Sequence, residues 1–120
     1  MTPYHFKLEE EPSIADIMWA AGIYEGEGHA TCSNGCTFHI KIDQKDPWIL
    51  YKLQKTWGGS VKLYKVYRWY VSSINAVQFC SFIYEYLSPW RQKQIDQAKS
   101  FSGIVYDFDK YHWLREITPG

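Results

Sequence analysis

The sequence predicts an α+β fold in the order α-β-β-α-β-β-α-α, with a four-stranded antiparallel sheet that carries its helices on one face and leaves the other open. Two pairs of short alternating segments, each followed by a segment of helical character, lead to this prediction. The chain has 120 residues, of which 46% are apolar and 18% aromatic, enough for one globular domain.

The first helix is expected to begin after Ser13, because Ser13 with Asp16 three residues later forms a capping-box variant. It runs to about Gly26. Two strands follow within residues 29–43, and Asn34-Gly35 between them is a strong hairpin signal. The second helix begins at Asp46 as its N-cap, with Pro47 in first position, and Gly58-Gly59 ends it.

The second pair of strands is expected at 60–64 and 68–72, with residues 65–67 as the turn. Residues 75–87 predict a helix, and Ser88-Pro89 starts another that extends to residue 101. A last short helix is expected at 109–116. Residues 1–12 form an N-terminal arm, 13–102 the folded domain and 103–120 its C-terminal extension.

Strand alternation assigns the two faces of the sheet. A two-residue turn at Asn34-Gly35 places Ala30 opposite His39. The core side then receives Phe38, Ile40, Ile42, Val61, Leu63, Trp69 and Val71, while Trp48, Trp57 and the Phe79–Phe82 segment complete the core. The outer face receives Ala30, Cys32, Thr37, His39, Lys41, Lys62, Tyr64, Arg68 and Tyr70.

The charges of this neutral chain are unevenly distributed. Residues 1–30 carry one Lys and six acids, whereas residues 31–70 carry seven Lys or Arg and two acids. Basic and aromatic side chains on the outer face are typical of a nucleic-acid surface, and an ordinary solvated face is the alternative.

Four residues with zinc-ligand chemistry, His29, Cys32, Cys36 and His39, lie within eleven positions. The predicted hairpin places Cys32 and His39 on one side and His29 and Cys36 on the other, which disfavours one tetrahedral site. Three cysteines, an odd number, favour a reducing, intracellular setting. No apolar run reaches the roughly 20 residues that a membrane span requires.

The first helix ends in an unusual pattern. Gly22 and Gly26 lie one turn apart on a face that Met18 extends, and such a face lets two helices approach closely. Glu25 and Glu27 follow at the helix C-terminus, where the helix dipole disfavours negative charge. A divalent cation would offset that cost, so the pattern favours a metal site at a dimer seam over a solvated turn.

The segment AAGIYEGEG at residues 20–28 resembles the signature of the LAGLIDADG homing endonucleases: Gly22 matches its first glycine, Glu25 and Glu27 its two acids, and Gly28 its last glycine. The TWGGSV junction, the entry to the second helix and the LSPWRQKQ segment extend the resemblance over roughly residues 13–100. The motif occurs once, which in this family implies a homodimer.

The resemblance implies a site-specific double-strand DNA endonuclease that hydrolyses phosphodiester bonds with Mg²⁺, for which Mn²⁺ substitutes, and that serves intron or intein mobility. It assigns Glu27 and the carbonyl of Gly26 to the metal, and Gln44 to a water. It assigns Arg91 or Lys93 to the developing phosphorane charge. The sites implied at the dimer interface are Met18, Gly22, Glu25 and Gly26, and those at DNA are Cys32, Thr37, His39, Lys41, Lys62, Tyr64, Arg68 and Tyr70.

The implied partners are duplex DNA with a long, partly palindromic site and a second copy of the chain, with no membrane. The implied setting is the cytoplasm of a prokaryote or phage-infected cell, or an organelle. Glu27 replaces the commoner Asp of the family, and Ala20 replaces its usual leading Leu. Two alternatives therefore stay open: a non-cleaving member of the same fold, such as an intron maturase or a regulator, and a plain homodimeric interaction module.

Overall fold

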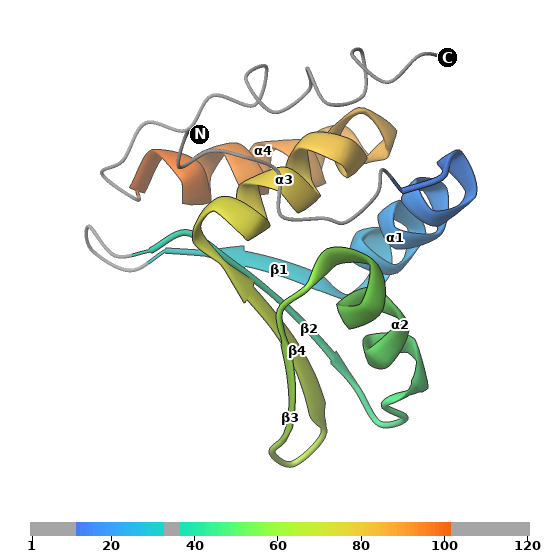
Figure 1. The fold of residues 1–120 in the computed structure, drawn as a ribbon. Coiled ribbons are helices and arrows are strands. Elements are labelled where there is room, and N and C mark those ends of the chain that lie inside the picture. The colour runs from blue at the N-terminus through green and yellow to red at the C-terminus, as the bar shows by residue number, and fades with distance from the viewer. Residues whose placement is uncertain (1–11, 33–36, 102–120) are drawn as a thin grey trace, which may run out of the picture.

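A computed structural model describes residues 12–32 and 37–101, and it confirms the predicted order of elements (Figure 1). The helices are α1 (Ile14–Glu27), α2 (Trp48–Trp57), α3 (Ser73–Ile83) and α4 (Pro89–Phe101), with a short 3₁₀ turn η1 (Tyr84–Tyr86) before α4. The strands are β1 (Gly28–Thr31), β2 (His39–Gln44), β3 (Ser60–Leu63) and β4 (Tyr67–Ser72). The Asn34-Gly35 turn, the helix at 109–116 and nearly all of the N-terminal arm lie outside the described residues.

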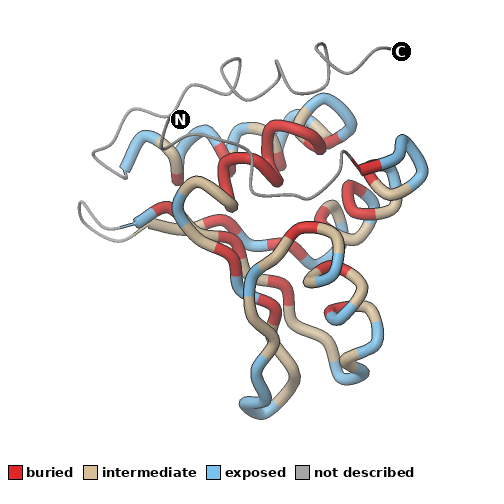
Figure 2. The backbone as a smooth tube through the Cα atoms, viewed as in Figure 1, coloured by how far each residue is buried: buried red, intermediate tan, exposed pale blue. Residues whose placement is uncertain are grey.

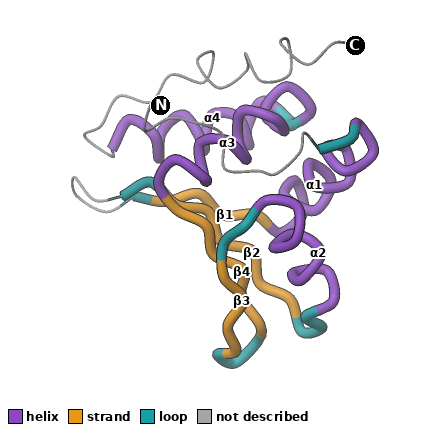
Figure 3. The backbone as a smooth tube through the Cα atoms, viewed as in Figure 1, coloured by secondary structure: helices purple, strands orange, loops and turns teal. Residues whose placement is uncertain are grey.

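The four strands form one antiparallel sheet in the order β1-β2-β4-β3, so the first strands of the two hairpins lie at the edges (Figure 3). The helices gather on one side of this sheet. None of the helices in the described ranges is long and apolar enough to cross a membrane.

The local signals for helix ends are confirmed. The Ser13 hydroxyl accepts a hydrogen bond from the backbone N–H of Asp16 at 3.1 Å. The Asp46 carboxylate accepts one from the N–H of Trp48 at 3.0 Å, and α2 starts one residue after Pro47. Gly58 and Gly59 both have positive φ, +82° and +90°, which few other residues adopt.

The core lies between the sheet and the helices (Figure 2). Phe79 of α3 is at its centre: its ring lies 5.2 Å from Trp57 of α2, 5.0 Å from Trp69 of β4 and 6.2 Å from Tyr24 of α1, each in an edge-to-face arrangement. Such aromatic pairs contribute about 0.5–1.5 kcal/mol each beyond their burial. One side chain therefore ties three elements together.

Two residues predicted for the core are exposed. Leu63 is on the core side of β3 but is 62% exposed, because it is the last residue of β3, next to the β3–β4 turn. Trp48 is 64% exposed in the first turn of α2, where its ring lies near the Lys52 ammonium. The predicted second turn is also shifted, since β4 already begins at Tyr67. The predicted 75–87 helix ends at Ile83 and continues as η1.

The register of the first hairpin differs from the prediction by one residue. Thr31, and not Ala30, pairs with His39, while Ala30 pairs with Ile40 and is buried. Because side chains alternate between faces, this shift moves His29 and Thr31 to the outer face and Ala30 to the core. Burial explains this register, because the position opposite Ile40 lies in the core and accepts Ala but not His.

Candidate functional site

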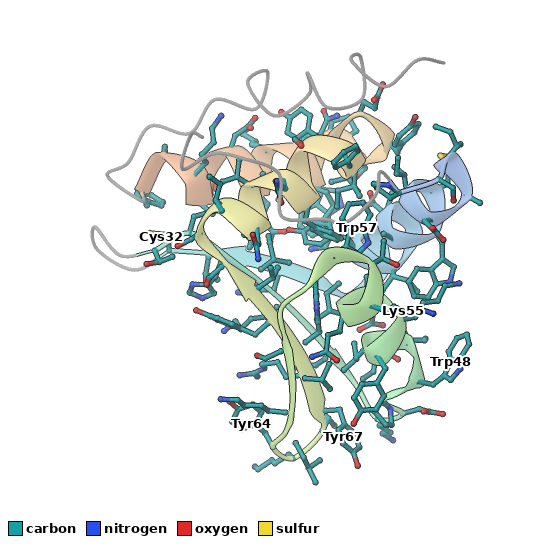
Figure 4. The ribbon with its side chains drawn as sticks, viewed as in Figure 1. Cys32, Trp48, Lys55, Trp57, Tyr64 and Tyr67 are labelled. Atoms are coloured by element: carbon teal, nitrogen blue, oxygen red, sulfur yellow. The ribbon has the colours of Figure 1, made fainter. Side chains whose placement is uncertain are left out.

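The outer face of the sheet is hollowed. A depression of about 330 Å³ is lined by seven residues of three strands and the β3–β4 turn: His39, Lys41, Ser60, Lys62, Tyr64, Arg68 and Tyr70. Tyr64 and Tyr67, labelled in Figure 4, point to opposite sides of the hairpin, with Tyr64 on the side away from α2. The structure thus brings together six of the eight residues predicted to contact DNA, and adds Ser60.

Strand pairing arranges these side chains in rows. Lys41 of β2 pairs with Tyr70 of β4, which pairs with Ser60 of β3. In the next row Asp43 pairs with Arg68, and Arg68 with Lys62. Directly opposed residues of antiparallel strands project from the same face, so both rows lie on the outer face, and all of their members except Asp43 line the hollow.

The other two predicted contacts, Thr37 and Cys32, lie outside the hollow. Thr37 is exposed just before β2 and its carbonyl oxygen contacts His39 Nδ1 at 3.1 Å. Cys32 follows β1 two residues after the buried Ala30, so it does not continue the outer row. His29 and Thr31 are the residues of β1 that project from the outer face, opposite Lys41 and His39. Only the observed register reveals this.

The edge of the outer face near β1 carries His29, whose pKa lies below its usual value. Burial lowers the pKa of His29, and Lys41 and Arg91 lower it further, so this imidazole is kept neutral more readily than a free histidine. The hydroxyl of Thr31 contacts His39 Nε2. His29 and His39 share one face, contrary to the predicted hairpin, while Cys36 lies outside the described residues. Within residues 12–32 and 37–101, no group of three or more His, Cys, Asp or Glu could hold a metal.

The second candidate site is the end of α1. Glu27 is the last residue of the helix, is exposed, and its carboxylate makes no hydrogen bond or ion pair within the described ranges. Gly28 follows and pairs with Ile42, so Gln44, two residues further along β2, lies at the same end of the strand pair. The register thus puts Gln44 at the end of the sheet where α1 ends.

Arg91 has a different environment from the one expected of a group that meets a phosphate. It is 8% exposed, and its Nε donates to the carbonyl oxygen of Glu25 at 3.0 Å. Its Nη1 donates to the carbonyl oxygen of Gly28 at 2.6 Å and to the Gln94 amide oxygen at 2.8 Å. The guanidinium thus binds the carbonyls at the C-terminal end of α1, where a positive charge is favourable.

Glu25 completes this junction from the other side. Its carboxylate accepts a hydrogen bond from the Ser88 N–H at 2.8 Å and one from the Ser88 hydroxyl at 2.7 Å, at the start of α4. The bonds from Ser88 hold the pKa of Glu25 below its usual value, and nearby Arg91 lowers it further. The end of α1 therefore caps α4, and α4 caps the end of α1. Glu25, predicted for the dimer interface, is bound within its own chain.

The aromatic wall behind the junction leaves no room for a side chain at Gly28. A Cβ atom there would overlap the ring of Tyr24, which is fully buried. The Arg91 guanidinium lies 4.4 Å from the Trp90 ring centroid and 5.6 Å from that of Tyr24. The last glycine of the motif is thus required by a close approach, because its φ of −73° suits any residue.

Lys93, the other basic candidate, is exposed on α4. Two positions along an α-helix differ by about 200° around the axis, so Lys93 points away from the junction that Arg91 enters. Of the two, only Arg91 reaches the end of α1.

The glycine stripe of α1 is uncovered in the protomer. A Cβ atom added at Gly22 or Gly26 would meet no atom within 4 Å, and Met18 and Ile14 on the same side are 49% and 63% exposed. A single protomer therefore leaves a smooth, partly apolar helix face open to solvent.

The oxygen donors at the end of α1 suit a hard divalent cation. One exposed carboxylate with a neighbouring backbone carbonyl is the chemistry that Mg²⁺ prefers, but Mg²⁺ takes six ligands. One protomer offers Glu27 and the Gly26 carbonyl, so further ligands would have to come from a second protomer, a phosphate and water. The residues fit the ion only as part of a larger assembly.

Comparisons with known proteins bear on the fold. No protein-family profile matches the chain. Over 65 residues it is 31% identical to the intron-encoded RNA maturase bI4 of Saccharomyces cerevisiae, a match that spans 52% of this chain and 10% of the maturase. Among solved structures it resembles the homing endonuclease I-CvuI, in complex with the I-CreI target in the presence of 2 mM Mg with the DNA not cleaved. That likeness has a TM-score of 0.55 and 18% identity, and covers 70% of this chain and 65% of that chain.

The chain therefore has the fold of a LAGLIDADG homing endonuclease, and the predicted α+β architecture is confirmed. It spans about a tenth of the maturase and about two thirds of the endonuclease chain that it matches.

The Glu25–Ser88 contact generates a prediction about stability and pH. Glu25→Gln should lower the free energy of unfolding at pH 7 by about 1–2 kcal/mol, because charged hydrogen bonds are lost. The folded-state pKa of Glu25 is lowered, so its contribution is fully present above the unfolded value of about 4.3 and is lost as the pH falls through the folded value. Urea unfolding from pH 7 to pH 3 should show the wild-type and variant curves converge in acid.

The matched control is Glu27→Gln. It removes the same charge two residues further along the chain, where the carboxylate has no partner in the described ranges. It should leave stability unchanged or slightly raised, since an anion leaves a helix C-terminus. Equal losses for both variants would contradict the assigned junction.

Proposed function

We propose that this chain is the protomer of a homodimeric, divalent-metal-dependent endonuclease that cuts duplex DNA at a long, partly palindromic site. The observation that carries the proposal is the joint arrangement of a basic hollow on the open sheet face and an exposed Glu27 at the end of α1. The fold of a homing endonuclease supports it.

In this proposal the sheet binds DNA. Lys41 and Lys62 lie on both sides of the central strand β4 and attract phosphates, while Arg68 and Tyr70 reach base edges in the major groove. A two-stranded ribbon or sheet face fits a major groove about 12 Å wide. A symmetric dimer would read two half-sites in opposite orientation, which gives the partly palindromic site.

Cleavage would take place at the dimer seam. The open Gly22 and Gly26 face lets the α1 helices of two copies approach, which brings the two Glu27 carboxylates near each other. A bound Mg²⁺ or Mn²⁺ supplies a Lewis acid and an activated water. Glu27 and the Gly26 carbonyl would hold the ion, and Gln44 would orient water near the scissile phosphate.

Arg91 has a positioning role in this proposal and not a catalytic one. Its Nε and Nη1 donate to the carbonyl oxygens of Glu25 and Gly28 and to Gln94. Glu27 lies between these two carbonyls in the chain, so Arg91 fixes its position. With Lys93 turned away, no basic side chain of the α1–α4 junction is offered directly to phosphate.

That environment favours one second candidate, a non-cleaving member of the same fold that binds nucleic acid, as a maturase or regulator does. The likeness to an RNA maturase supports it as well. A cleavage screen with Mg²⁺ against the uninterrupted version of the gene that hosts this reading frame separates the two. A plain interaction module would bind neither DNA nor RNA.

Binding should depend on the lysines of the hollow. Lys62→Ala should weaken binding to duplex DNA several-fold and reduce the slope of log K against log [salt] by about 1, because one fewer counterion is released. Fluorescence anisotropy from 50 to 200 mM salt measures both quantities. Lys55→Ala on α2, on the other side of the sheet, is the control and should change neither; equal effects would mean that the binding face is wrong.

Cleavage should depend on Glu27. Glu27→Gln keeps the size of the side chain but removes the charge that a hard cation needs, so Mg²⁺-dependent cutting should fall by orders of magnitude. DNA affinity should persist, because the sheet contacts are elsewhere. Nicking assays with and without Mg²⁺ test this, and normal cutting by the variant would exclude Glu27 as the metal ligand.

Assembly should depend on the glycine stripe. Gly22→Leu meets no atom of its own protomer, so the fold should persist while two helix backbones are pushed apart. Light scattering should show a wild-type dimer and a folded monomeric variant. A wild-type monomer with or without DNA would refute the dimer.

A further inference from the structure

An ion pair lies beside the basic hollow, with Arg68 as the partner that lines it. Asp43 of β2 and Arg68 of β4 are direct cross-strand partners on the two central strands. Arg68 Nε donates to Asp43 Oδ1 at 2.8 Å, and Nη2 donates to Oδ2 at 3.1 Å. The two parallel bonds hold the guanidinium plane in one orientation, since a fork of this kind leaves little freedom to rotate.

Tyr64 restrains the same group from another side. The Arg68 Cζ atom lies 5.0 Å from the centroid of the Tyr64 ring, a cation–π distance. The pair is nevertheless accessible, because the Arg68 and Asp43 side chains are 34% and 40% exposed. Arg68 is therefore fixed in place and still open to a ligand in the hollow.

The bonds to Asp43 use only one edge of the guanidinium. They occupy Nε and one N–H of Nη2, and no contact within the described ranges uses Nη1. The remaining edge, formed by Nη1 and the second N–H of Nη2, presents two parallel donors. Two donors at this spacing match the O6 and N7 acceptors of guanine in the major groove.

The charge of the ion pair favours a base over a phosphate as the ligand of that edge. The Asp43 carboxylate largely neutralises Arg68, so the pair attracts a phosphate weakly. Its hydrogen-bond donors remain directional and suit the uncharged acceptors of a base. Lys41 and Lys62 line the same hollow, and in the described part of the chain neither forms a salt bridge, although the Lys41 charge acts on Asp43; both ammonium groups remain available to the DNA backbone.

We propose that Arg68 reads a guanine in the major groove of duplex DNA and that Asp43 is the positioning residue that orients it. This inference rests on the proposed function and assigns one base contact within it. Each half-site of the target would then contain a guanine that is selected by this pair, at one position fixed by the register of β4.

The test is selection from a randomised duplex library, followed by affinity measurements on the enriched site and on its single-base variants. The wild-type protein should prefer guanine at one position per half-site by about 5- to 150-fold over the other bases. Arg68→Ala should remove the preference at that position alone. Exposed ion pairs contribute little to stability, so the variant should fold as the wild type does.

Asp43→Asn distinguishes positioning from simple attraction. It should reduce the guanine preference because the fork is lost, while the slope of log K against log [salt] steepens by about 1 because Arg68 regains its full charge. A purely structural role for Asp43 would leave the guanine preference unchanged. Lys62→Ala is the control, with a shallower slope and an unchanged base preference.

The outcomes are separable. If the wild type selects a sequence that Arg68→Ala leaves unaltered, or if Asp43→Asn lowers affinity with the guanine preference and the slope intact, the guanine assignment is wrong and the proposed function stands. If the wild type enriches no duplex at any salt concentration, the proposed function itself fails.

Discussion

The buried guanidinium of Arg91 fixes the end of α1, and the rest of the candidate site depends on that position. Burial of an unpaired charge would be costly, and three hydrogen bonds to backbone and amide oxygens offset the cost. The same contacts neutralise the negative end of the helix dipole next to two glutamates. Ser88 takes one of these, Glu25, so that Glu27 alone is presented to solvent.

The sheet imposes a second division of labour, because only one of its faces is covered. Ile40, Ile42, Trp69 and Val71 are buried against the helices, and the residues between them along the same strands line the hollow. A protein with no net charge can therefore carry a basic surface. Gly28 connects the end of α1 to the sheet: it caps α1, begins β1, and its carbonyl oxygen accepts a hydrogen bond from Arg91.

The α1–α4 junction and the hollow differ in how rigidly they hold their polar groups. The α1–α4 junction is part-buried and held by hydrogen bonds of Glu25, Ser88 and Arg91. The hollow is open, and its lining combines Arg68, which Asp43 holds in place, with a half-buried Lys41 and the exposed Lys62, Tyr64 and Tyr70. Such a combination suits a surface that binds a long polyanion weakly at many points and reads it closely at a few.

The sequence alone determined the order of elements, the caps at Ser13 and Asp46, the inward faces of β2 and β4, and six of the seven residues that line the hollow. These features depend on neighbours within a few positions, so composition and period reveal them. The register of β1 was missed by one residue because it is decided by what Ala30 meets across the strands, and the roles of Glu25 and Arg91 because their partners lie more than sixty residues away. Only the folded chain brings α4 against the end of α1, and that contact decides which acid is left exposed.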